Sequence, residues 1–310
     1  MQDQYTIRPY RPRDEAGFLD AWNEVMWADP LNTTRWRGTY LLDPNFTPDE
    51  CLVAEETTSG TIVGVVLGFS DKRRDSNDAW IVGFGVRPEH RRKGIGTEML
   101  TRLMDGWRKD GIATIHVGPY IPSYLIPGVD VSAYADALPF LASLGAVEKD
   151  RPLSMKASLT NYRVRGNVAP LAGKLRSEGI EVRPGTGDDI LPLLAFMEEH
   201  FPHWVPDARR VLGAIVSGGE STSTLHVATD NGEIIGYAQT TMERFGPFGV
   251  NADYRGRGIG AVLLSRALVA MRAQSFHSAW FLWTSDRTAK LYREHGFEEV
   301  RRFAMVDIPL

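Results

Sequence analysis

The stretch FGVRPEHRRKGIGTEMLTRLM at residues 84–104 recurs at residues 248–268 as FGVNADYRGRGIGAVLLSRAL. In each copy a short run with β-strand character ends in Phe-Gly-Val, polar residues rich in arginine and glycine follow, and an apolar-periodic segment comes last. Leu264, Leu268 and Met271 fall on one face of the second apolar segment at helical spacing. Each copy therefore predicts a strand, a glycine-rich turn and a helix, in that order.

Three further pairs of segments repeat in the same chain order: 6–22 with 180–197, 51–68 with 225–239, and 134–146 with 285–297. The first pair is typical of a strand leading into a helix, the second of a hairpin, and the third of a helix. We therefore predict two copies of one α/β (mixed α+β) fold, each a mixed, largely antiparallel sheet flanked by helices. The predicted domains are 1–158 and 180–310, and the linker 159–179 between them is either loose or a packed helix.

Composition limits the class of protein. The chain has 310 residues, about twice the ~150 of one typical domain, so length alone favours two domains. Its 35 basic and 39 acidic residues nearly balance, which argues against a general nucleic-acid binder. No apolar run approaches the ~18–20 residues of a membrane span, and the N-terminus lacks the apolar core of a signal peptide. We expect a cytoplasmic protein that binds neither membranes nor nucleic acid.

The glycine-rich turn of the second copy is suited to an anion. Gly256, Gly258 and Gly260 leave the backbone free to curl, so that successive N–H groups can point at one ligand. The helix that follows adds its own unpaired N–H groups and the positive end of its dipole. Arg255 and Arg257 supply charge at the rim, and together these features favour a pyrophosphate.

The first copy keeps this pattern with fewer glycines. Arg91, Arg92 and Lys93 precede Gly94 and Gly96. Neither turn fits the dinucleotide fingerprint G-x-G-x-x-G, nor the P-loop, in which the lysine follows the glycine. A solvated basic turn and a nucleic-acid patch are the alternative interpretations of this basic segment.

The Arg-x-x-Gly-x-Gly turn between a strand and a helix resembles the acyl-CoA pyrophosphate motif of the GNAT N-acetyltransferase superfamily. The later segment SDRTAKLYREHGF at 285–297 is similar to the closing motif of that family, Asn-x-x-Ala-x-x-Leu-Tyr followed by Gly-Phe. Ser285 stands at the Asn position and Tyr292 at the Tyr position, whereas Leu141 occupies the tyrosine position of the first copy. The resemblance covers nearly the whole chain as two tandem domains.

The resemblance implies that acetyl-CoA is the co-substrate. It further implies that the backbone N–H of Val250 binds the thioester carbonyl and that Tyr292 donates a hydrogen bond to the departing thiolate. The acetyl-CoA contacts implied in the second copy are Val250, Arg255, Gly256, Arg257, Gly258, Ile259, Gly260 and Ser285. Those implied in the first copy are Val86, Arg91, Arg92, Lys93, Gly94, Ile95 and Gly96.

Acyl transfer to an amine is helped by a base, because at pH 7 an alkyl amine of pKa ~10.4 is protonated by more than about a thousand to one. Glu243, at the end of an apparent strand, is the leading candidate for this base, and His226 and His203 are alternatives. A solvated carboxylate is the other interpretation of Glu243, and a packed helix residue that of Tyr292. Cys51, the one cysteine, fits a buried thiol better than a nucleophile, which favours direct attack in a ternary complex.

The segment EHFPHWVPDARR at 199–210 lies between two predicted helices of the second copy. In the family such a segment borders the acceptor site, so Phe201, His203 and Trp204 are candidate acceptor contacts. The aromatic residues could instead pack between the domains. His200 and His203 do not indicate a metal, because no third ligand lies nearby and their spacing is not that of a helical i, i+4 pair.

The sequence thus predicts an acetyl-CoA-dependent N-acetyltransferase that acts on a primary amine of a small molecule or peptide, with its chemistry in the C-terminal copy. The N-terminal copy either binds a second acetyl-CoA or is a structural half. A non-catalytic acyl-CoA sensor or scaffold is the alternative function. A monomer and a homodimer are both compatible with the sequence.

Overall fold

The computed structural model describes residues 4–71, 76–121, 125–216 and 223–310. The chain divides into two compact units. The N-terminal unit is Met1–Pro152 together with Arg302–Leu310, and the C-terminal unit is Leu153–Arg301.

In the N-terminal unit the strands are β1 (Tyr5–Pro9), β2 (Cys51–Glu56), β3 (Ile62–Ser70), β4 (Asp78–Val86), β5 (Thr114–Val117), β6 (Val129–Asp130), β7 (Val147–Asp150) and the end of β14 (Phe297–Pro309). The helices are α1 (Glu15–Val25), α2 (Thr33–Arg35), η2 (Trp36–Leu41), α3 (Ile95–Lys109) and α4 (Ala137–Ser143). Short 3-10 turns are η1 (Pro12–Asp14), η3 (Pro48–Glu50) and η4 (Pro88–His90).

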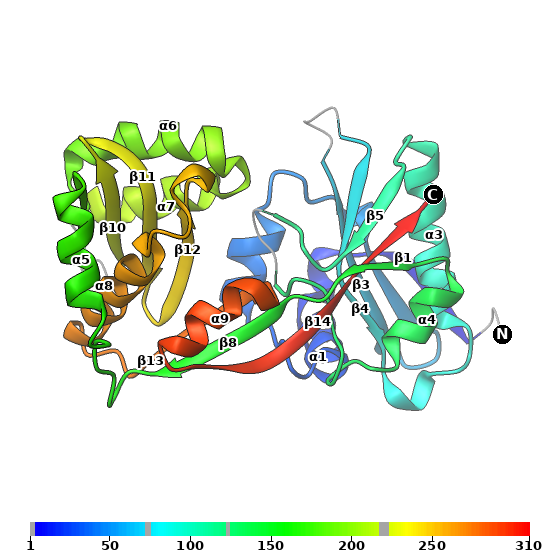
Figure 1. Ribbon diagram of the computed structural model, residues 1–310. Coiled ribbons are helices and arrows are strands. Elements are labelled where there is room, and N and C mark those ends of the chain that lie inside the picture. The colour runs from blue at the N-terminus through cyan, green and yellow to red at the C-terminus, as the bar shows by residue number, and fades with distance from the viewer. Residues whose placement is uncertain (1–3, 72–75, 122–124, 217–222) are drawn as a thin grey trace. The chain divides into compact units, whose positions relative to one another are not determined.

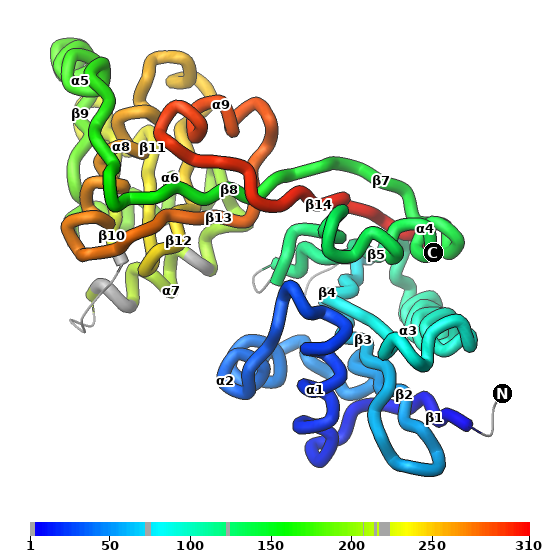
Figure 2. The backbone as a smooth tube through the Cα atoms, turned by 90° about the horizontal axis from the view of Figure 1, so that it is seen from below, coloured from blue at the N-terminus to red at the C-terminus, as the bar shows by residue number. Residues whose placement is uncertain are grey.

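The sheet of this unit has the order β1-β2-β3-β4-β5-β14-β7, and its strands are antiparallel except for the parallel pair β4 and β5. Helix α1 packs Phe18 and Trp22 into an aromatic core on one face. Helices α3 and α4 pack Leu103 and Leu141 into an aliphatic core on the other (Figure 2). The predicted sheet flanked by helices is confirmed.

In the C-terminal unit the strands are β8 (Leu153–Ser158), β9 (Ile180–Pro184), β10 (Ser223–Asp230), β11 (Glu233–Thr241), β12 (Arg244–Val250), β13 (Ser278–Thr284) and the start of β14. The helices are α5 (Val168–Ser177), α6 (Ile190–His200), α7 (Val205–Val216), α8 (Ile259–Ala273) and α9 (Asp286–Glu294). Short 3-10 turns are η5 (Gly187–Asp189), η6 (Pro202–Trp204) and η7 (Ala252–Tyr254).

The second sheet has the order β9-β10-β11-β12-β13-β8, with β12 and β13 as its parallel pair (Figure 1). One face carries α5, α8 and α9, and the other carries α6 and α7. The order from β9 to β13 is that of β1 to β5 in the first unit. The repeat found in the sequence is therefore a repeat of structure.

The last residues of the chain complete the N-terminal sheet. Val306 pairs with Val117 of β5 on one side and with Glu148 of β7 on the other. In both Figure 1 and Figure 2 the red end of β14 lies beside β5. Strand β8, which follows the N-terminal unit in the chain, instead pairs with β13 in the C-terminal sheet. The compact units thus exchange terminal strands, whereas the predicted boundary at residue 158 follows chain order.

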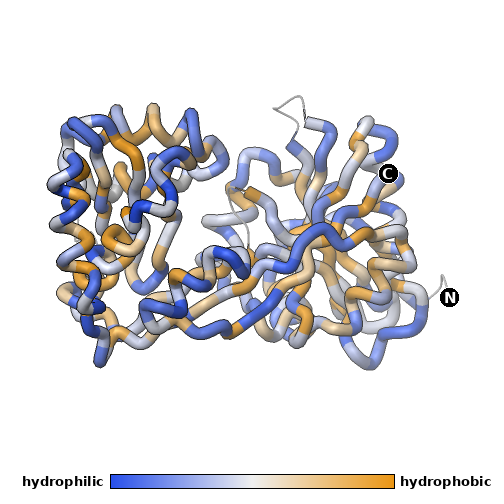
Figure 3. Tube along the Cα trace, viewed as in Figure 1, coloured by the Kyte–Doolittle hydropathy of each residue, from blue (hydrophilic) through white to orange (hydrophobic). Residues whose placement is uncertain are grey.

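The segment predicted as a linker contains a packed helix. Helix α5 buries Val168 and Leu175 in the core of the C-terminal unit. Apolar and polar residues alternate along the helices of both units (Figure 3), as expected when one helix face is buried. Among the residues that the structure describes, no helix has the length and hydropathy that crossing a membrane requires.

Each unit contains a bidentate ion pair between an arginine on a strand and an aspartate in the turn that follows it. The guanidinium of Arg8 donates to both carboxylate oxygens of Asp14, at 2.6 and 2.9 Å, and Arg183 does the same to Asp189 at 2.7 and 2.8 Å. The hydrogen bonds from Arg183 lower the pKa of Asp189 to about 2. Each ion pair ties the strand that carries its arginine, β1 or β9, to the turn that begins the next helix, so the repeated Arg-Pro of the sequence has a structural role.

Candidate functional site

Each glycine-rich turn presents backbone N–H groups without partners. In the second turn Gly256 and Gly258 have φ of 78° and 88°, and in the first turn Arg92 and Gly94 have φ of 61° and 79°. This alternation of left-handed residues makes a concave nest of N–H groups. Within the described chain, the N–H groups of residues 92–94 and 256–258 donate no hydrogen bond. The N-termini of α3 and α8 follow directly, so both turns are suited to a phosphate.

Arg92 holds a position that Gly256 occupies in the other copy. An L-residue with a side chain is strained at positive φ by about 1–2 kcal/mol, and glycine is not. We expect Arg92→Gly to raise the stability of the N-terminal unit by about 0.5–1 kcal/mol, because glycine's larger unfolded-state entropy offsets part of the relief. Denaturant unfolding followed by tryptophan fluorescence measures this. Arg92→Ala is the control, since it removes the same side chain but keeps Cβ. Equal stability of the two variants would contradict the argument.

The strand before each turn ends at an opening in the sheet. Strands β12 and β13 pair only at Arg244 and Trp280, and then diverge. Val250 lies beyond that point. The N–H of Asn251 donates to the carbonyl of Ile235 at 2.8 Å, so Val250 occupies the non-hydrogen-bonded position of the β11–β12 ladder. Its own N–H and carbonyl therefore point away from β11, toward the opening.

The first unit repeats this geometry. Strands β4 and β5 pair as far as Ile81 and Val117, and the N–H of Arg87 donates to the carbonyl of Val63 at 2.8 Å. The N–H of Val86 is thereby directed away from β3. In both units the motif arginine folds back on this strand end. Nε of Arg91 donates to the carbonyl of Val86 at 2.9 Å, and Nε of Arg255 to that of Val250 at 3.3 Å.

The two turns differ in what lies against them. A Cβ added at Gly94 meets nothing within 4 Å, whereas one at Gly258 meets Cδ2 of Leu171 at 2.6 Å. Arg257 donates to Glu178, at the C-cap of α5, at 2.6 Å. This hydrogen bond from Arg257 lowers the pKa of Glu178. Helix α5 therefore borders the second turn, and its C-cap residue Glu178 pairs with Arg257 of that turn. No local pattern in the sequence predicts these contacts.

Tyr292 lies among aromatic rings beside the opening of the second sheet. Its ring centroid is 4.3 Å from that of Phe281 on β13 and 6.2 Å from that of Phe248 on β12. The hydroxyl makes no hydrogen bond to another described residue. Burial raises the pKa of Tyr292, so the phenol stays protonated and can donate. In the first unit the counterpart Leu141 is fully buried and has no such group.

Glu243 lies away from this opening. It precedes the start of β12, while Val250 ends that strand, so about 20 Å of extended chain separates them. Its carboxylate accepts from the N–H of Ser278 at 3.1 Å and from the hydroxyl of Ser278 at 2.7 Å. The hydroxyl hydrogen bond from Ser278 lowers the pKa of Glu243, which makes it a weaker base. The structure places Glu243 where it holds the start of β13, at the opposite end of β12 from Val250.

The segment predicted at the acceptor site reaches the strand that carries Val250. A Cβ added at Gly249 would lie 2.6 Å from the ring of Phe201, so this ring packs directly on the strand. Trp204 stacks on Phe201 with ring centroids 5.1 Å apart. His203 is exposed beside them. The aromatic pair thus forms an apolar surface next to the strand end, within the C-terminal unit.

The remaining candidates have other positions. Ser285 caps α9, since its hydroxyl accepts from the N–H of Thr288 at 3.3 Å. His226 lies on β10 and lines a pocket with α5 and α8. Cys51 is buried, and burial raises the pKa of its thiol, as expected of a core residue. In the described part of the chain, no group of three or more His, Cys, Asp and Glu residues is arranged to hold a metal.

One polar pair in the N-terminal unit was not predicted from the sequence. The hydroxyl of Tyr134 donates to the carboxylate of Asp29 at 2.8 Å. Tyr134 packs against the cores on both faces of the sheet. In the repeat of 134–146 and 285–297, Tyr134 aligns with Ser285, and this alignment could have drawn attention to Tyr134 as a candidate residue.

Family models match both units. A model described as the acetyltransferase (GNAT) family matches residues 17–120, and one described as an acetyltransferase (GNAT) domain matches residues 221–299. A search of curated proteins finds no match.

Solved structures share the fold over the full chain. The GCN5-related glucosamine N-acetyltransferase region of a fungal multi-domain GH3 β-N-acetylglucosaminidase is 18% identical with a TM-score of 0.82, covering 99% of this chain and 38% of that one. A GCN5-related N-acetyltransferase from Sphaerobacter thermophilus is 18% identical with a TM-score of 0.71, covering 99% and 96%. A tandem GNAT protein from the clavulanic acid biosynthesis pathway is 16% identical with a TM-score of 0.65, covering 99% and 98%. At these identities the similarity concerns the fold.

Proposed function

The chain belongs to the GNAT acetyltransferase family and carries two of its domains, and from this premise we propose that it is an acetyl-CoA-dependent N-acetyltransferase. The acceptor is a primary amine of a small molecule or peptide. The observation that carries the proposal is one arrangement in the C-terminal unit. A glycine-rich turn with unpaired N–H groups directly follows the strand end at Val250, whose N–H points away from β11, and the ring of Tyr292 packs on Phe248 of the same strand.

The residues of the turn fit the diphosphate of acetyl-CoA, because their unpaired N–H groups need acceptors and α8 adds its positive dipole end. When bound, acetyl-CoA supplies the thioester that the acceptor amine attacks. The N–H of Val250 stabilises the oxyanion that develops on the carbonyl. Tyr292 donates a hydrogen bond as the carbon–sulfur bond breaks. The proton lost by the amine leaves through solvent, and the thiolate gains one.

Phe201 and Trp204 support an acceptor with an apolar face, because they stack beside Gly249 on the strand that carries Val250. A pyranose ring offers such a face and stacks on aromatic side chains. Together with the full-chain fold similarity to a glucosamine N-acetyltransferase region, this makes an amino sugar the first acceptor to test.

A second candidate function applies to the N-terminal unit. Its turn is open at Gly94, but Leu141 replaces the tyrosine. These two observations favour a unit that binds acyl-CoA without catalysing transfer, so a non-catalytic sensor is the alternative for the whole chain if no amine is turned over.

Calorimetric titration with acetyl-CoA, combined with a thiol-release assay over amino sugars, small amines and peptides, tests the proposal. We expect binding and acceptor-dependent thiol release. Gly258→Val and Gly94→Val should each remove the binding of its own unit, with thermal melting as the check on folding. Binding without release over the whole panel would support the sensor, and the absence of binding would refute both functions.

Glu178 pairs with Arg257 of the second turn and so competes with the diphosphate of acetyl-CoA for this arginine. We expect Glu178→Gln to tighten acetyl-CoA binding by the C-terminal unit about fivefold at low salt, since Arg257 no longer pairs with a carboxylate. The effect should shrink as added salt screens the exposed charges. Glu181→Gln, an exposed change of the same charge on β9, is the control in the same titration. Equal affinities of the two variants would show that Glu178 does not restrict the turn.

A further inference from the structure

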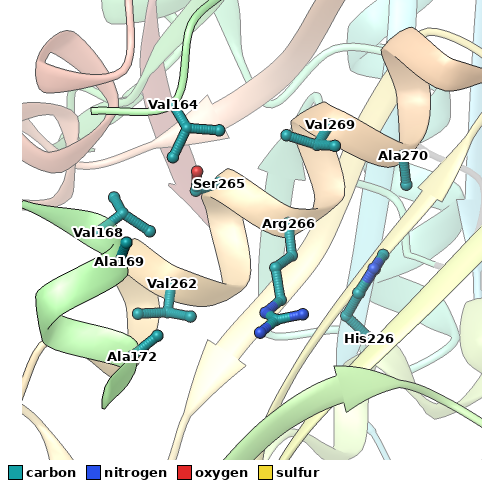
Figure 4. A pocket seen from close by; sticks show the side chains of 10 residues that line it. All are labelled: Val164, Val168, Ala169, Ala172, His226, Val262, Ser265, Arg266, Val269 and Ala270. Carbon is teal, nitrogen blue, oxygen red and sulfur yellow. The ribbon is translucent and has the colours of Figure 1, made fainter. Parts of the chain in front are cut away.

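A pocket in the C-terminal unit lies between α5, α8 and β10. Its volume is about 330 Å³, within the range of small-molecule sites. Valine and alanine side chains from α5, α8 and the segment before α5 form most of its wall (Figure 4). The polar residues of its lining are His226, Ser265 and Arg266. The pocket shares none of the residues assigned above to acetyl-CoA or the acceptor.

His226 is buried in this wall without a hydrogen-bond partner. Only 6% of its surface is exposed, and Nδ1 is sealed from solvent with no partner among the described residues. Burial, with a smaller contribution from the charge of Arg266, lowers the pKa of His226 to about 4, so the ring is neutral at pH 7. A buried N–H without an acceptor is rarer than an unpaired acceptor, so the proton belongs on Nε2. Nε2–H is then the group that His226 can offer to a ligand.

Arg266 supplies the charge of the pocket. It extends from α8 toward the strand that carries His226 (Figure 4). Across the described ranges it forms no ion pair or hydrogen bond, unlike Arg272 on the same helix, which donates to the carbonyl of Tyr162. Arg266 is half-buried, and its guanidinium, near the neutral imidazole of His226 on an otherwise aliphatic wall, is free to pair with an anion that enters the pocket.

We propose that this pocket binds a small organic carboxylate with an apolar chain, whose carboxylate meets Arg266 and His226 and whose chain lies against the valines and alanines. A carboxylate suits the planar guanidinium, which can donate two parallel hydrogen bonds to it. Among the described residues that line the pocket, Arg266 is the one cation, which matches a ligand with one negative charge. The aliphatic wall favours a hydrocarbon body on the ligand over a fully polar one.

Octanoate is the probe. Titration of the full-length protein, by calorimetry and by NMR of the histidine side chains, should show one site in which octanoate shifts the signal of His226. Arg266→Gln should weaken binding at least about tenfold, as expected for the loss of a charge-assisted hydrogen bond. Ala169→Leu, at an exposed position of α5 that lines the pocket, should also weaken binding because the larger side chain fills it. His226→Ala identifies the shifted signal.

Lys290→Gln is the matched control, because it removes one exposed positive charge from α9 in the same unit. We expect its affinity for octanoate to stay within about twofold of the parent protein, a small change by the usual worth of surface charges. 1-Octanol, which lacks the charge, should bind much more weakly than octanoate. Three results would each overturn the proposal: absence of binding at millimolar octanoate, an affinity of Arg266→Gln and Ala169→Leu equal to that of the parent protein, or complete competition by acetyl-CoA.

Discussion

Removal of residues 302–310 should unfold the N-terminal unit while the C-terminal unit keeps its structure. The deleted segment is the strand between β5 and β7 of the N-terminal sheet, and it buries Phe303, Val306 and Ile308 there. Burial of each of these side chains contributes about 1.5–3 kcal/mol, and their sum approaches the roughly 5–15 kcal/mol that stabilises a whole domain. Strand β7 also loses its partner.

Hydrogen exchange followed by mass spectrometry measures this effect unit by unit. Amides of β4 and β5 should exchange rapidly in the truncated chain, whereas those of β10 and β11 should stay protected. A synthetic peptide of residues 297–310 should restore protection, and a scrambled peptide of the same composition should not. Full protection of β5 in the truncated chain would mean that the last strand is dispensable.

Tyr292→Phe should lower kcat about 100-fold, the range expected for loss of one proton-donating group, and leave acetyl-CoA affinity and Tm nearly unchanged. The substitution keeps the ring contacts with Phe281 and Phe248 and removes only the hydroxyl. Because burial raises the pKa of Tyr292, the neutral donor persists to higher pH than an ordinary phenol. The kcat profile should therefore show no loss from tyrosine ionisation below about pH 10.

Tyr254→Phe is the matched control for this prediction. The hydroxyl of Tyr254 donates to Asp230 at 2.9 Å, so its removal makes the same chemical change outside the sheet opening. Steady-state thiol release by the two variants, at saturating acetyl-CoA, separates the roles. Unchanged turnover by Tyr292→Phe would exclude this tyrosine from the reaction.

Much of the site was predictable from the sequence, because its signals are local. A strand ending in Phe-Gly-Val, a turn with glycines at fixed spacing and an amphipathic helix are each specified within a few residues. The turn geometry therefore follows from Gly94, Gly256 and Gly258 themselves, which have the positive φ that glycine permits. The position of Tyr292 beside the opening follows from its place in a helix after the strand of Phe281.

The position of Glu243 relative to Val250 could not be predicted from the sequence. Its distance from Val250 depends on which end of β12 each residue occupies, and the sequence pattern placed the strand boundary too loosely to decide this. The contact of Leu171 with Gly258 and the pairing of Glu178 with Arg257 join α5 to a turn about 80 residues later. Such pairs have no periodicity that a window along the chain can detect.

The sequence by itself determined that this protein has two copies of one α/β unit, where each glycine-rich turn lies, and that only the second copy has a tyrosine at the position of Tyr292. Tertiary structure alone decided that β8 belongs to the C-terminal unit and the end of β14 to the N-terminal unit, and that α5 borders the turn of its own unit. The physical reason is the distance along the chain over which each kind of interaction acts. Dihedral preferences and amphipathic periods act between near neighbours, whereas strand pairing uses backbone groups that every residue shares, so the choice of partner emerges only when the whole chain packs.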